Sequence, residues 1–472
     1  MTILLAGCGY LGEYLADLLH EAGHQVTGLT LSPESAARLA ESKPWRVLTC
    51  DISRPDSVAD IEGAFDVVIH CASSNRGGTE VYRQVFEHGL INLTRAFPNA
   101  KFVFTSSTSV YPQTDGSIVN EESPAEPDRE TGRILRAAED LIVARGGIVA
   151  RLAGIYGPGR WYVLKNLLAG EAAIEANDGN GRALNQIHRD DAASALLHLI
   201  DQGTQGIFNV SDDEPVTQRD AFTKLCPLFN APMPPVVPPN PDRKRGWTHK
   251  FVSNAKLRAA GWTPKFPRCT DAISNDPLLV PSILDQVLTD KGSIPRSPNI
   301  IVIGLMGCGK STVGRIVSGM IGFRFVDTDQ LICDAAKTSI PRIFEREGEA
   351  GFRKRESAAL RSLLGKRGHV IATGGGIVTQ PHNIPLLRQL GFIVWLDAGV
   401  NTLVRRTASS NDRPLLRDED PKAKLERLLE VRKPLYKGIA DLRIVTDDLT
   451  PQETSYGVAE SARIWFTKQH EG

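Results

Sequence analysis

Short apolar runs alternate with longer stretches of helical period over about the first 270 residues. The apolar runs are typical of buried strands, and stretches such as 10–22 and 35–41 place their apolar residues on one side of a helix. Strands that alternate with helices predict a parallel sheet covered by helices on both faces. The strands predicted in this part of the chain are 3–6, 25–29, 67–70 and 102–105.

The same alternation restarts after a polar stretch, DKGSIPRSPN at 290–299, which has the composition of a linker. A proline-rich segment from about residue 232 predicts irregular structure before that point. We therefore expect two α/β domains, at 1–285 and 299–472, joined by a linker at 286–298. The strands predicted in the second domain are 300–303, 323–326, 370–372, 392–396 and 442–445.

The composition is that of a globular protein, with 41% hydrophobic and 23% charged residues. Lys plus Arg and Asp plus Glu balance at 55 each, so we expect neither nucleic acid nor an anionic membrane as a partner. Seven cysteines without a C-x-x-C pair predict reduced thiols, and no apolar run reaches the length of a membrane span. The start, MTILLAGCGY, is interpreted as a first strand rather than a signal peptide. Together these features predict a cytoplasmic protein.

A glycine-rich loop, GLMGCGKST at 304–312, follows a predicted strand and precedes a predicted helix. This context is that of a P-loop, whose backbone N–H groups bind phosphate oxygens at a helix N-terminus. We expect Lys310 to reach the β- and γ-phosphates of ATP and the Ser311 hydroxyl to bind Mg²⁺. The predicted loop contacts to ATP are Gly307, Cys308, Gly309, Lys310, Ser311 and Thr312.

Other polar groups in this half indicate the acceptor. Asp327 and Asp329 end the second predicted strand, and the glycines 374–376 end another, where open α/β sheets bind ligands. Three arginines, Arg353, Arg413 and Arg432, could bind carboxylate or phosphate. Solvated arginines and a helix cap before QLICDAA are the plainer alternatives. The set favours a small, anionic, hydroxylated acceptor.

Residues 299–450 resemble shikimate kinase throughout. The motifs that carry the resemblance are the P-loop, Asp327-Thr328-Asp329, Phe352-Arg353-Lys354-Arg355-Glu356, Gly374–Gly376, the lid Arg413–Leu416 with Arg406 before it, and Arg432–Tyr436. The resemblance implies phosphorylation of the shikimate 3-hydroxyl by ATP, a step toward chorismate and the aromatic amino acids. Another small-metabolite kinase, such as a gluconate-type enzyme, is the alternative on the same scaffold.

The resemblance also implies residue roles. Arg353 and Arg432, with the Gly375 backbone N–H, would bind the shikimate carboxylate, and Asp329 would bind the ring hydroxyls and act as the base. Asp327 and Ser311 would hold Mg²⁺. Arg406 would pack on the adenine, while Lys310 and the lid residue Arg413 would stabilise the transferred phosphoryl group.

A second glycine-rich loop, GCGYLG at 7–12, lies between the first strand and the first helix, which is the Rossmann dinucleotide fingerprint. The acid expected about 20 residues later is absent, since the second strand ends GLTLSP, and Thr30, Ser32 and Arg38 tolerate a 2′-phosphate. NAD(P) is therefore the expected cofactor, with NADP favoured weakly. The expected contacts are Gly7, Gly9, Tyr10, Leu11, Gly12, Asp51 and Ser107.

Residues 1–270 resemble the extended short-chain dehydrogenase/reductase (SDR) family, of the NAD-dependent epimerase/dehydratase type. The matching stretches are Asp51-Ile52, VVIHCAS (67–73), FTSSTSVYP (104–112), RLAGIYGPGR (151–160), NQIHRDDAASAL (185–196) and FNVSDDEP (208–215). The family's Tyr-x-x-x-Lys is replaced by Thr131 and Leu135, which cannot shuttle a proton. Tyr111 is interpreted as structural rather than as a substitute, His188 as a packing or turn residue, and Asp190 or Asp191 as a helix cap.

Three hypotheses for the whole chain follow. One is a kinase whose N-terminal domain binds NAD(P) without turning it over, as a sensor, scaffold or regulatory module; the missing Tyr and Lys favour it. The second is a bifunctional enzyme with a genuine N-terminal reductase or epimerase. The third, a binding protein with an inert kinase domain, is disfavoured by the intact set Lys310, Asp329, Arg353 and Arg432. The sequence leaves the oligomeric state and any coupling between the domains open.

Overall fold

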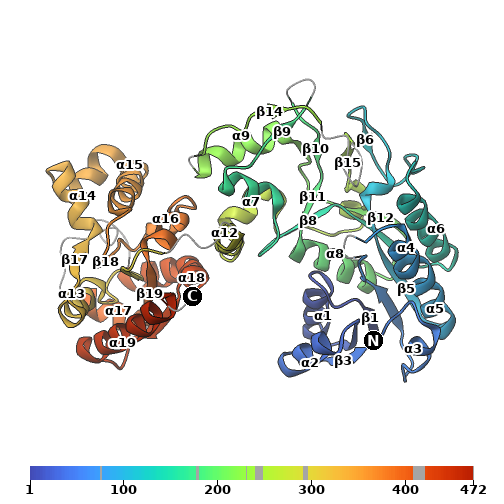
Figure 1. Cartoon of the computed structure of the whole chain (residues 1–472), viewed down its shortest axis with the longest axis horizontal. Coiled ribbons are helices and arrows are strands. Elements are labelled where there is room, and N and C mark those ends of the chain that lie inside the picture. Colours follow the sequence, from blue (N-terminus) through green and yellow to red (C-terminus); the bar gives the residue numbers. More distant parts are fainter. Residues whose placement is uncertain are drawn as a thin grey trace. The chain divides into compact units, whose positions relative to one another are not determined.

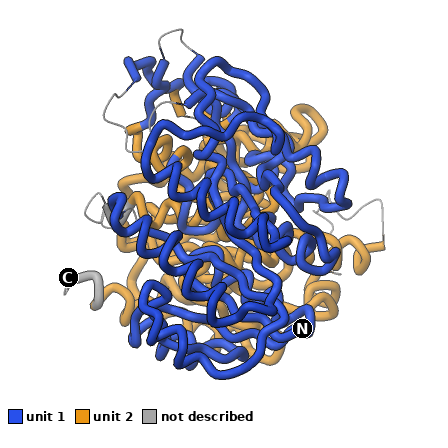
Figure 2. Tube along the Cα trace, turned by 90° about the vertical axis from the view of Figure 1, so that its right-hand side faces the viewer, with its two compact units in different colours: residues 1–162, 172–224, 233–272 blue, residues 163–171, 225–232, 273–472 orange. Residues whose placement is uncertain are grey.

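The computed structural model describes residues 1–74, 77–176, 180–229, 231–239, 248–290, 296–407 and 420–470 (Figure 1). The chain forms two compact units, coloured separately in Figure 2. Unit 1 comprises residues 1–162, 172–224 and 233–272, and unit 2 comprises 163–171, 225–232 and 273–472. The domain limits at 285 and 299 stay a prediction.

Unit 1 is built on a seven-stranded parallel sheet of order β12-β7-β5-β4-β1-β2-β3. Strand β1 is flanked by β4 and β2, and the order of the strands reverses between β1 and β4. The crevice for ligands is therefore expected beside the carboxyl end of β1. The strands are β1 (Thr2–Ala6), β2 (Gln25–Thr30), β3 (Arg46–Thr49), β4 (Val67–His70), β5 (Lys101–Ser107), β7 (Ile148–Leu152) and β12 (Gly206–Val210).

Short two-stranded sheets lie outside this sheet and are formed by segments that follow or connect its strands. They are β6 with β15, β8 with β11, β9 with β14 and β10 with β13. Their bounds are β6 (Ile118–Val119), β8 (Gly154–Tyr156), β9 (Ile174–Glu175), β10 (Ala183–Leu184), β11 (Gln186–His188), β13 (Val216–Thr217), β14 (Val236–Val237) and β15 (Phe251–Val252).

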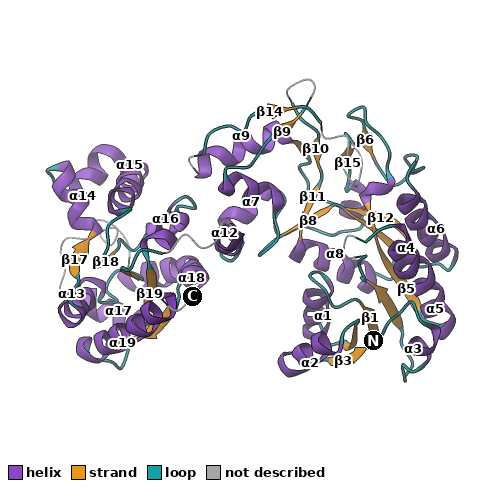
Figure 3. Ribbon diagram, in the orientation of Figure 1, coloured by secondary structure: helices purple, strands orange, loops and turns teal. Residues whose placement is uncertain are grey.

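Helices flank the large sheet, as Figure 3 shows. Apolar clusters lie on both faces of the sheet: Leu5 and Leu15 belong to one cluster, and Leu4 and Leu90 to the other. The helices of residues 1–290 are α1 (Gly12–Glu21), α2 (Pro33–Ser42), α3 (Pro55–Ala59), α4 (Thr79–Tyr82), a π-helix η1 (Arg83–His88), α5 (Gly89–Ala96), a 3₁₀ turn η2 (Thr108–Val110), α6 (Glu130–Ala144), α7 (Tyr162–Ala169), α8 (Arg189–Asp201), α9 (Gln218–Phe229), α10 (Ala255–Ala259), α11 (Cys269–Asn275) and α12 (Leu279–Asp290).

Unit 2 contains a five-stranded parallel sheet of order β17-β18-β16-β19-β20. Its strands are β16 (Ile300–Ile303), β17 (Arg324–Asp327), β18 (His369–Ala372), β19 (Phe392–Asp397) and β20 (Leu442–Val445). The flanking helices are α13 (Lys310–Ile321), α14 (Thr328–Ala336), α15 (Ile340–Leu363), the 3₁₀ turn η3 (Ile377–Thr379), α16 (Asn383–Leu390), α17 (Val400–Thr407), α18 (Pro421–Ile439) and α19 (Pro451–His470).

The predicted α/β class is confirmed for both halves of the chain. All seven cysteines are free thiols, as their spacing predicted. In the part of the chain that the structure describes, none of the helices combines the length and the apolar character that a bilayer crossing needs.

Candidate functional site

The phosphate-binding loop connects β16 to α13 at the centre of the second sheet. Gly307 and Gly309 have φ angles of 84° and 100°, a region that glycine enters without strain. Gly309 is the residue before the first turn of α13, so the free N–H groups of that helix face the loop. The Lys310 Nζ donates to the Leu305 carbonyl at 3.0 Å, which holds the ammonium group over the loop. The result is a cationic cradle for phosphate oxygens.

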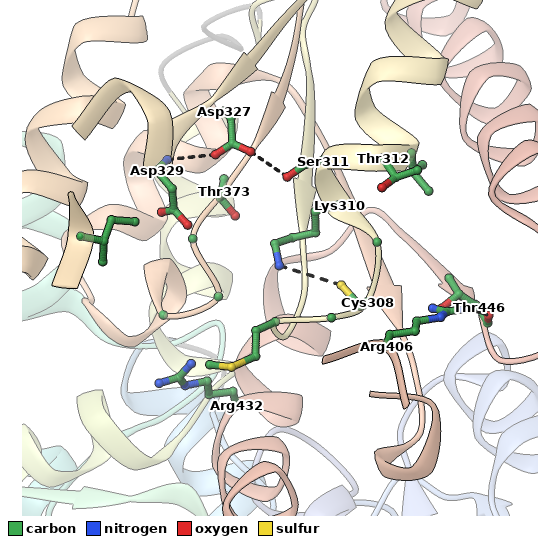
Figure 4. A pocket seen from close by; sticks show the side chains of 18 of the residues that line it. Cys308, Lys310, Ser311, Thr312, Asp327, Asp329, Thr373, Arg406, Arg432 and Thr446 are labelled. Atoms are coloured by element: carbon green, nitrogen blue, oxygen red, sulfur yellow. Dashed lines mark hydrogen bonds between the residues drawn. The ribbon is translucent and has the colours of Figure 1, made fainter. Parts of the chain in front are cut away.

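A cavity of about 700 Å³ opens in front of this loop. It brings together nearly all the residues that the sequence predicted for the kinase site: the loop residues Gly307, Cys308, Gly309, Lys310, Ser311 and Thr312, and Asp327, Asp329, Arg353, Gly375, Arg406 and Arg432. Figure 4 shows several of these side chains converging on it. The predicted lid residue Arg413 lies outside the described residues.

Asp327 accepts hydrogen bonds from both the phosphate loop and the backbone of Asp329. The Ser311 Oγ donates to one Asp327 oxygen at 2.7 Å, and the Asp329 backbone N–H donates to the other at 3.0 Å (Figure 4). The second bond makes Asp327 the N-cap of α14, so the capping alternative applies to Asp327. A hydroxyl and a carboxylate in contact beside a phosphate loop are the oxygen donors that Mg²⁺ prefers, and these residues fit that ion.

Arg353 is a buried cation, 7% exposed, and two carboxylates hold its side chain in place. Its guanidinium donates to Glu356 and to Glu349, each at 2.7 Å. Glu356 is fully buried, and burial raises the pKa of its carboxyl while the charge of Arg353 opposes the rise. One Glu356 oxygen, Oε1, accepts no hydrogen bond from the residues that the structure describes. Arg353 is therefore a fixed, buried cation at the wall of the cavity, available for an anionic ligand.

The triple glycine lets these side chains approach the backbone. A Cβ on Gly374 would lie 2.5 Å from Glu356 Oε1, and one on Gly376 would lie 2.1 Å from a nitrogen of Arg353. The hydroxyl of the buried Tyr436 donates to the Gly375 carbonyl, which fixes the middle peptide of the turn. Any side chain at 374 or 376 would displace the Arg353–Glu356 pair.

Arg406 lies at the opposite end of the cavity. Its guanidinium donates to the Thr446 carbonyl at 2.9 Å and to the Thr446 hydroxyl at 3.2 Å (Figure 4). Leu449 and Pro451 also line the cavity. The sequence analysis did not name Thr446, Leu449 or Pro451 as site residues. They follow the carboxyl end of β20, and that end of a parallel strand is where such sheets bind ligands.

The first glycine-rich loop fits the dinucleotide fingerprint in backbone geometry. Gly7 has a φ of 105°, and a Cβ there would lie 2.4 Å from the Ala72 nitrogen. A Cβ on Gly12 would lie 2.1 Å from the Gly7 carbonyl, whereas one on Gly9 would meet no atom of the protein. The first and third glycines thus serve packing, and the second leaves free space at the start of α1, where the fingerprint places a pyrophosphate.

The other predicted dinucleotide contacts are part of the local backbone framework. The Tyr10 hydroxyl donates to the Pro158 carbonyl at 3.0 Å, and Leu11 is buried. One carboxylate oxygen of Asp51 accepts from the backbone N–H and the hydroxyl of Ser53. The Ser107 hydroxyl accepts from the Ser109 N–H and begins the turn η2. Direct contact of these side chains with a dinucleotide stays a prediction.

The positions that replace the SDR tyrosine and lysine lie on α6. Thr131 is half-buried in the first turn of the helix, and Leu135, 4% exposed, packs into an apolar cluster of the unit. Tyr111 cannot replace the tyrosine, because its hydroxyl is buried, donates to Asn209 at 2.9 Å and accepts from Arg151 at 2.8 Å. Burial raises the pKa of Tyr111, and its structural role is confirmed.

The N-terminus of α8 differs from the expected arrangement of His188 and the two aspartates that follow it. His188 is buried and its Nδ1 accepts from the Asp190 N–H, so the imidazole caps α8. The expectation that Asp190 or Asp191 caps this helix is wrong. Asp191 instead accepts from the backbone N–H groups of Lys265 and Phe266, at 2.6 and 2.9 Å, and ties α8 to a distant loop.

Comparison with known proteins gives matches to both halves of the chain. Residues 306–463 match the family model of shikimate kinase, and residues 3–211 match that of the NAD dependent epimerase/dehydratase family. A shikimate kinase of Marinomonas sp. is 46% identical over 170 residues, which cover 36% of this chain and 93% of the relative. A shikimate kinase of Thioalkalivibrio sulfidiphilus is 49% identical over 152 residues, which cover 32% of this chain and 80% of the relative.

A solved structure from Methylobacillus flagellatus, assigned as an NAD-dependent epimerase/dehydratase, is 29% identical and covers 59% of this chain and 97% of its own, with a TM-score of 0.47. The P-loop, the acidic pair and the buried arginines of unit 2 occur in the part of the chain that matches the kinases. The chain belongs to the shikimate kinase family through its C-terminal half, and residues 3–211 of its N-terminal half match the model of the NAD dependent epimerase/dehydratase family.

Proposed function

We propose that the C-terminal half transfers the γ-phosphoryl group of ATP to the 3-hydroxyl of shikimate. The observation that carries this proposal is the single cavity in which the phosphate loop, Asp329, Arg353 and Arg432 meet. The last two cations would bind the carboxylate of the acceptor together with the Gly375 N–H. The even balance of acidic and basic residues supports a partner set without nucleic acid or anionic membrane. The free thiols support a cytoplasmic location.

In this mechanism the chain positions and polarises two substrates. The N–H groups of the loop and Lys310 hold the phosphates of ATP, and Arg406 packs on the adenine. The presence of Arg406 in the wall of the same cavity supports this role. Asp329 accepts the proton of the attacking hydroxyl. Ser311 and Asp327 would hold Mg²⁺, which when bound neutralises negative charge on the phosphates. Arg413 is proposed to complete this neutralisation from the lid.

The kinase proposal is tested on the full chain with ATP, Mg²⁺ and shikimate, by following ADP release with a coupled assay. We expect release that depends on shikimate, and none when gluconate replaces it. Product analysis should place the phosphate on the 3-hydroxyl. If the purified chain leaves ATP intact with shikimate present, the proposal is wrong; turnover of gluconate instead would favour the alternative kinase.

We further propose that the N-terminal domain binds NAD(P), NADP in preference, without catalysing hydride transfer. The free space at Gly9 supports binding, and the apolar packing of Leu135 argues against a proton shuttle on α6. A bound dinucleotide would supply hydride chemistry only with a proton-transferring group beside it. Repeating the kinase assay with and without NADPH tests whether the two halves communicate. Consumption of NADPH with a carbonyl compound would contradict this second proposal.

Replacing Gly9 with alanine should separate dinucleotide binding from folding. The new methyl group meets no protein atom, so stability should be unchanged, but it fills the space at the start of α1. We expect the Kd for NADPH to rise about tenfold or more, since overpacking a site costs about 1–3 kcal/mol. Quenching of NADPH fluorescence measures it. The matched control is Gly319→Ala on α13, where a Cβ also meets nothing; equal affinity in both variants would refute the assignment.

A further inference from the structure

A buried lysine in the N-terminal domain has no role in the framework described above. Lys250 is 3% exposed and directly precedes β15. Its Nζ donates to the Tyr111 carbonyl at 2.6 Å. Among the residues that the structure describes, no carboxylate is paired with this ammonium group. An ammonium group has three donors, so a buried one with a single carbonyl acceptor is poorly compensated.

A second cation lies beside it. Burial and then the positive charge of Arg182 lower the pKa of Lys250 to about 8. The two segments that carry these residues are joined by hydrogen bonds: the Ala183 N–H donates to His249, and the Asn185 side chain bonds the Lys250 carbonyl and the Val252 N–H. Two cations are thus held together by a fixed framework, an arrangement that an anion between them would stabilise.

The position of the pair is that of a ligand site. Tyr111 follows the turn η2, which continues from the carboxyl end of β5. Ligands of open parallel sheets bind outside the carboxyl ends of the strands. The same turn begins at Ser107, the predicted dinucleotide contact, so the lysine lies on the side of the sheet where a second substrate would bind.

We propose that Lys250 and Arg182 form an anion-binding site of the N-terminal domain, which recognises a carboxylate or phosphate group of a small molecule. The proposal does not depend on the kinase activity, because both residues belong to unit 1. It explains why Lys250 is buried with the Tyr111 carbonyl as the one hydrogen-bond acceptor that the described part of the chain offers its ammonium group. The anion would supply further acceptors and the opposite charge.

Hydrogen exchange of the full chain, resolved by peptide, tests this site without interference from the phosphate loop of the kinase. Sodium sulfate and sodium malonate are compared with sodium chloride at equal ionic strength, as probes of a phosphate-like and a carboxylate group. At an anion concentration ten times Kd, exchange that requires opening of the site should slow about tenfold. We expect this in peptides covering 112–119 and 248–254 with at least one of the two anions, and the anion that acts identifies the group.

The variants decide whether the lysine is responsible. Lys250→Met, of similar size and without charge, should lose the response while kinase turnover is unchanged. The matched control is Lys256→Met, because the exposed Lys256 also donates to a backbone carbonyl, that of Ile207, at 2.8 Å, and its variant should respond like the wild type. Arg182→Met should weaken the response as well. It provides the test of the site if Lys250→Met does not fold. No slowing by either anion in the wild type, or an unchanged response in Lys250→Met, overturns the proposal.

Discussion

Asp329→Asn is expected to lower kcat for shikimate phosphorylation by about 10²–10⁴-fold, the usual contribution of a positioned general base. The amide keeps the size of the side chain but cannot accept the proton of the attacking hydroxyl. The backbone N–H of residue 329, which bonds Asp327, is untouched, so the cap of α14 and the Ser311 contact should remain. Steady-state kinetics with saturating ATP measures the effect, and the Kd for ATP should change little.

Asp334→Asn is the control for this variant. Asp334 lies on the same helix, is exposed and accepts a hydrogen bond from the Gln330 side chain. Removing its charge changes the net charge of the chain equally but leaves the cavity intact, so kcat should stay near that of the wild type. If Asp329→Asn retains more than about a tenth of the wild-type kcat, which is less than one general base contributes, then Asp329 is not the base.

Arg353→Ala is expected to abolish measurable turnover and to reduce the free energy of unfolding by about 3–5 kcal/mol. The turnover is lost because the acceptor carboxylate loses a fixed cation. Stability falls because Glu356, which has no exposed surface, loses the partner of its charge. Denaturant unfolding measures the second effect and the coupled kinase assay the first. Arg353→Ala therefore tests binding and folding at once.

Two further variants separate these effects. Arg355→Ala removes an arginine two residues along the same helix, but one whose partner Glu347 is largely solvated, and surface pairs contribute about 0–1 kcal/mol. It should leave both activity and stability nearly unchanged. The double variant Arg353→Ala/Glu356→Gln removes the buried charge and should recover stability without recovering activity. Recovery of activity in the double variant would show that Arg353 acts only on folding.

The sequence predicted the central strands and both nucleotide loops because their signals are local. Buried strands such as β1 and β16 are continuous apolar runs, and Gly307 and Gly309 mark a backbone that only glycine enters easily. Strand β3 (Arg46–Thr49) was missed because it is an edge strand with no fully buried residue, so its pattern carries no core face.

The less predictable features depend on contacts between distant segments. That His188 rather than Asp190 caps α8 follows from the orientation of a buried ring, which helix-cap statistics do not contain. The contact of Arg406 with Thr446 joins residues 40 positions apart. The burial of Glu356 likewise depends on two elements, since Arg353 and Glu356 share α15 whereas Gly374 belongs to the turn after β18. The motif alone therefore indicated the spacing of these residues but not their electrostatics.

The hydroxyl of Tyr436 on the Gly375 carbonyl ties the helix that carries Arg432 to the turn that offers the N–H group. These two parts of the proposed carboxylate site, Arg432 and the Gly375 N–H, are therefore held in a fixed relative position. A change of acceptor preference therefore cannot come from moving α18 or the glycine turn alone. We expect a substitution that shifts α18, even at the buried Ile439 at its far end, to change which acids the proposed site accepts.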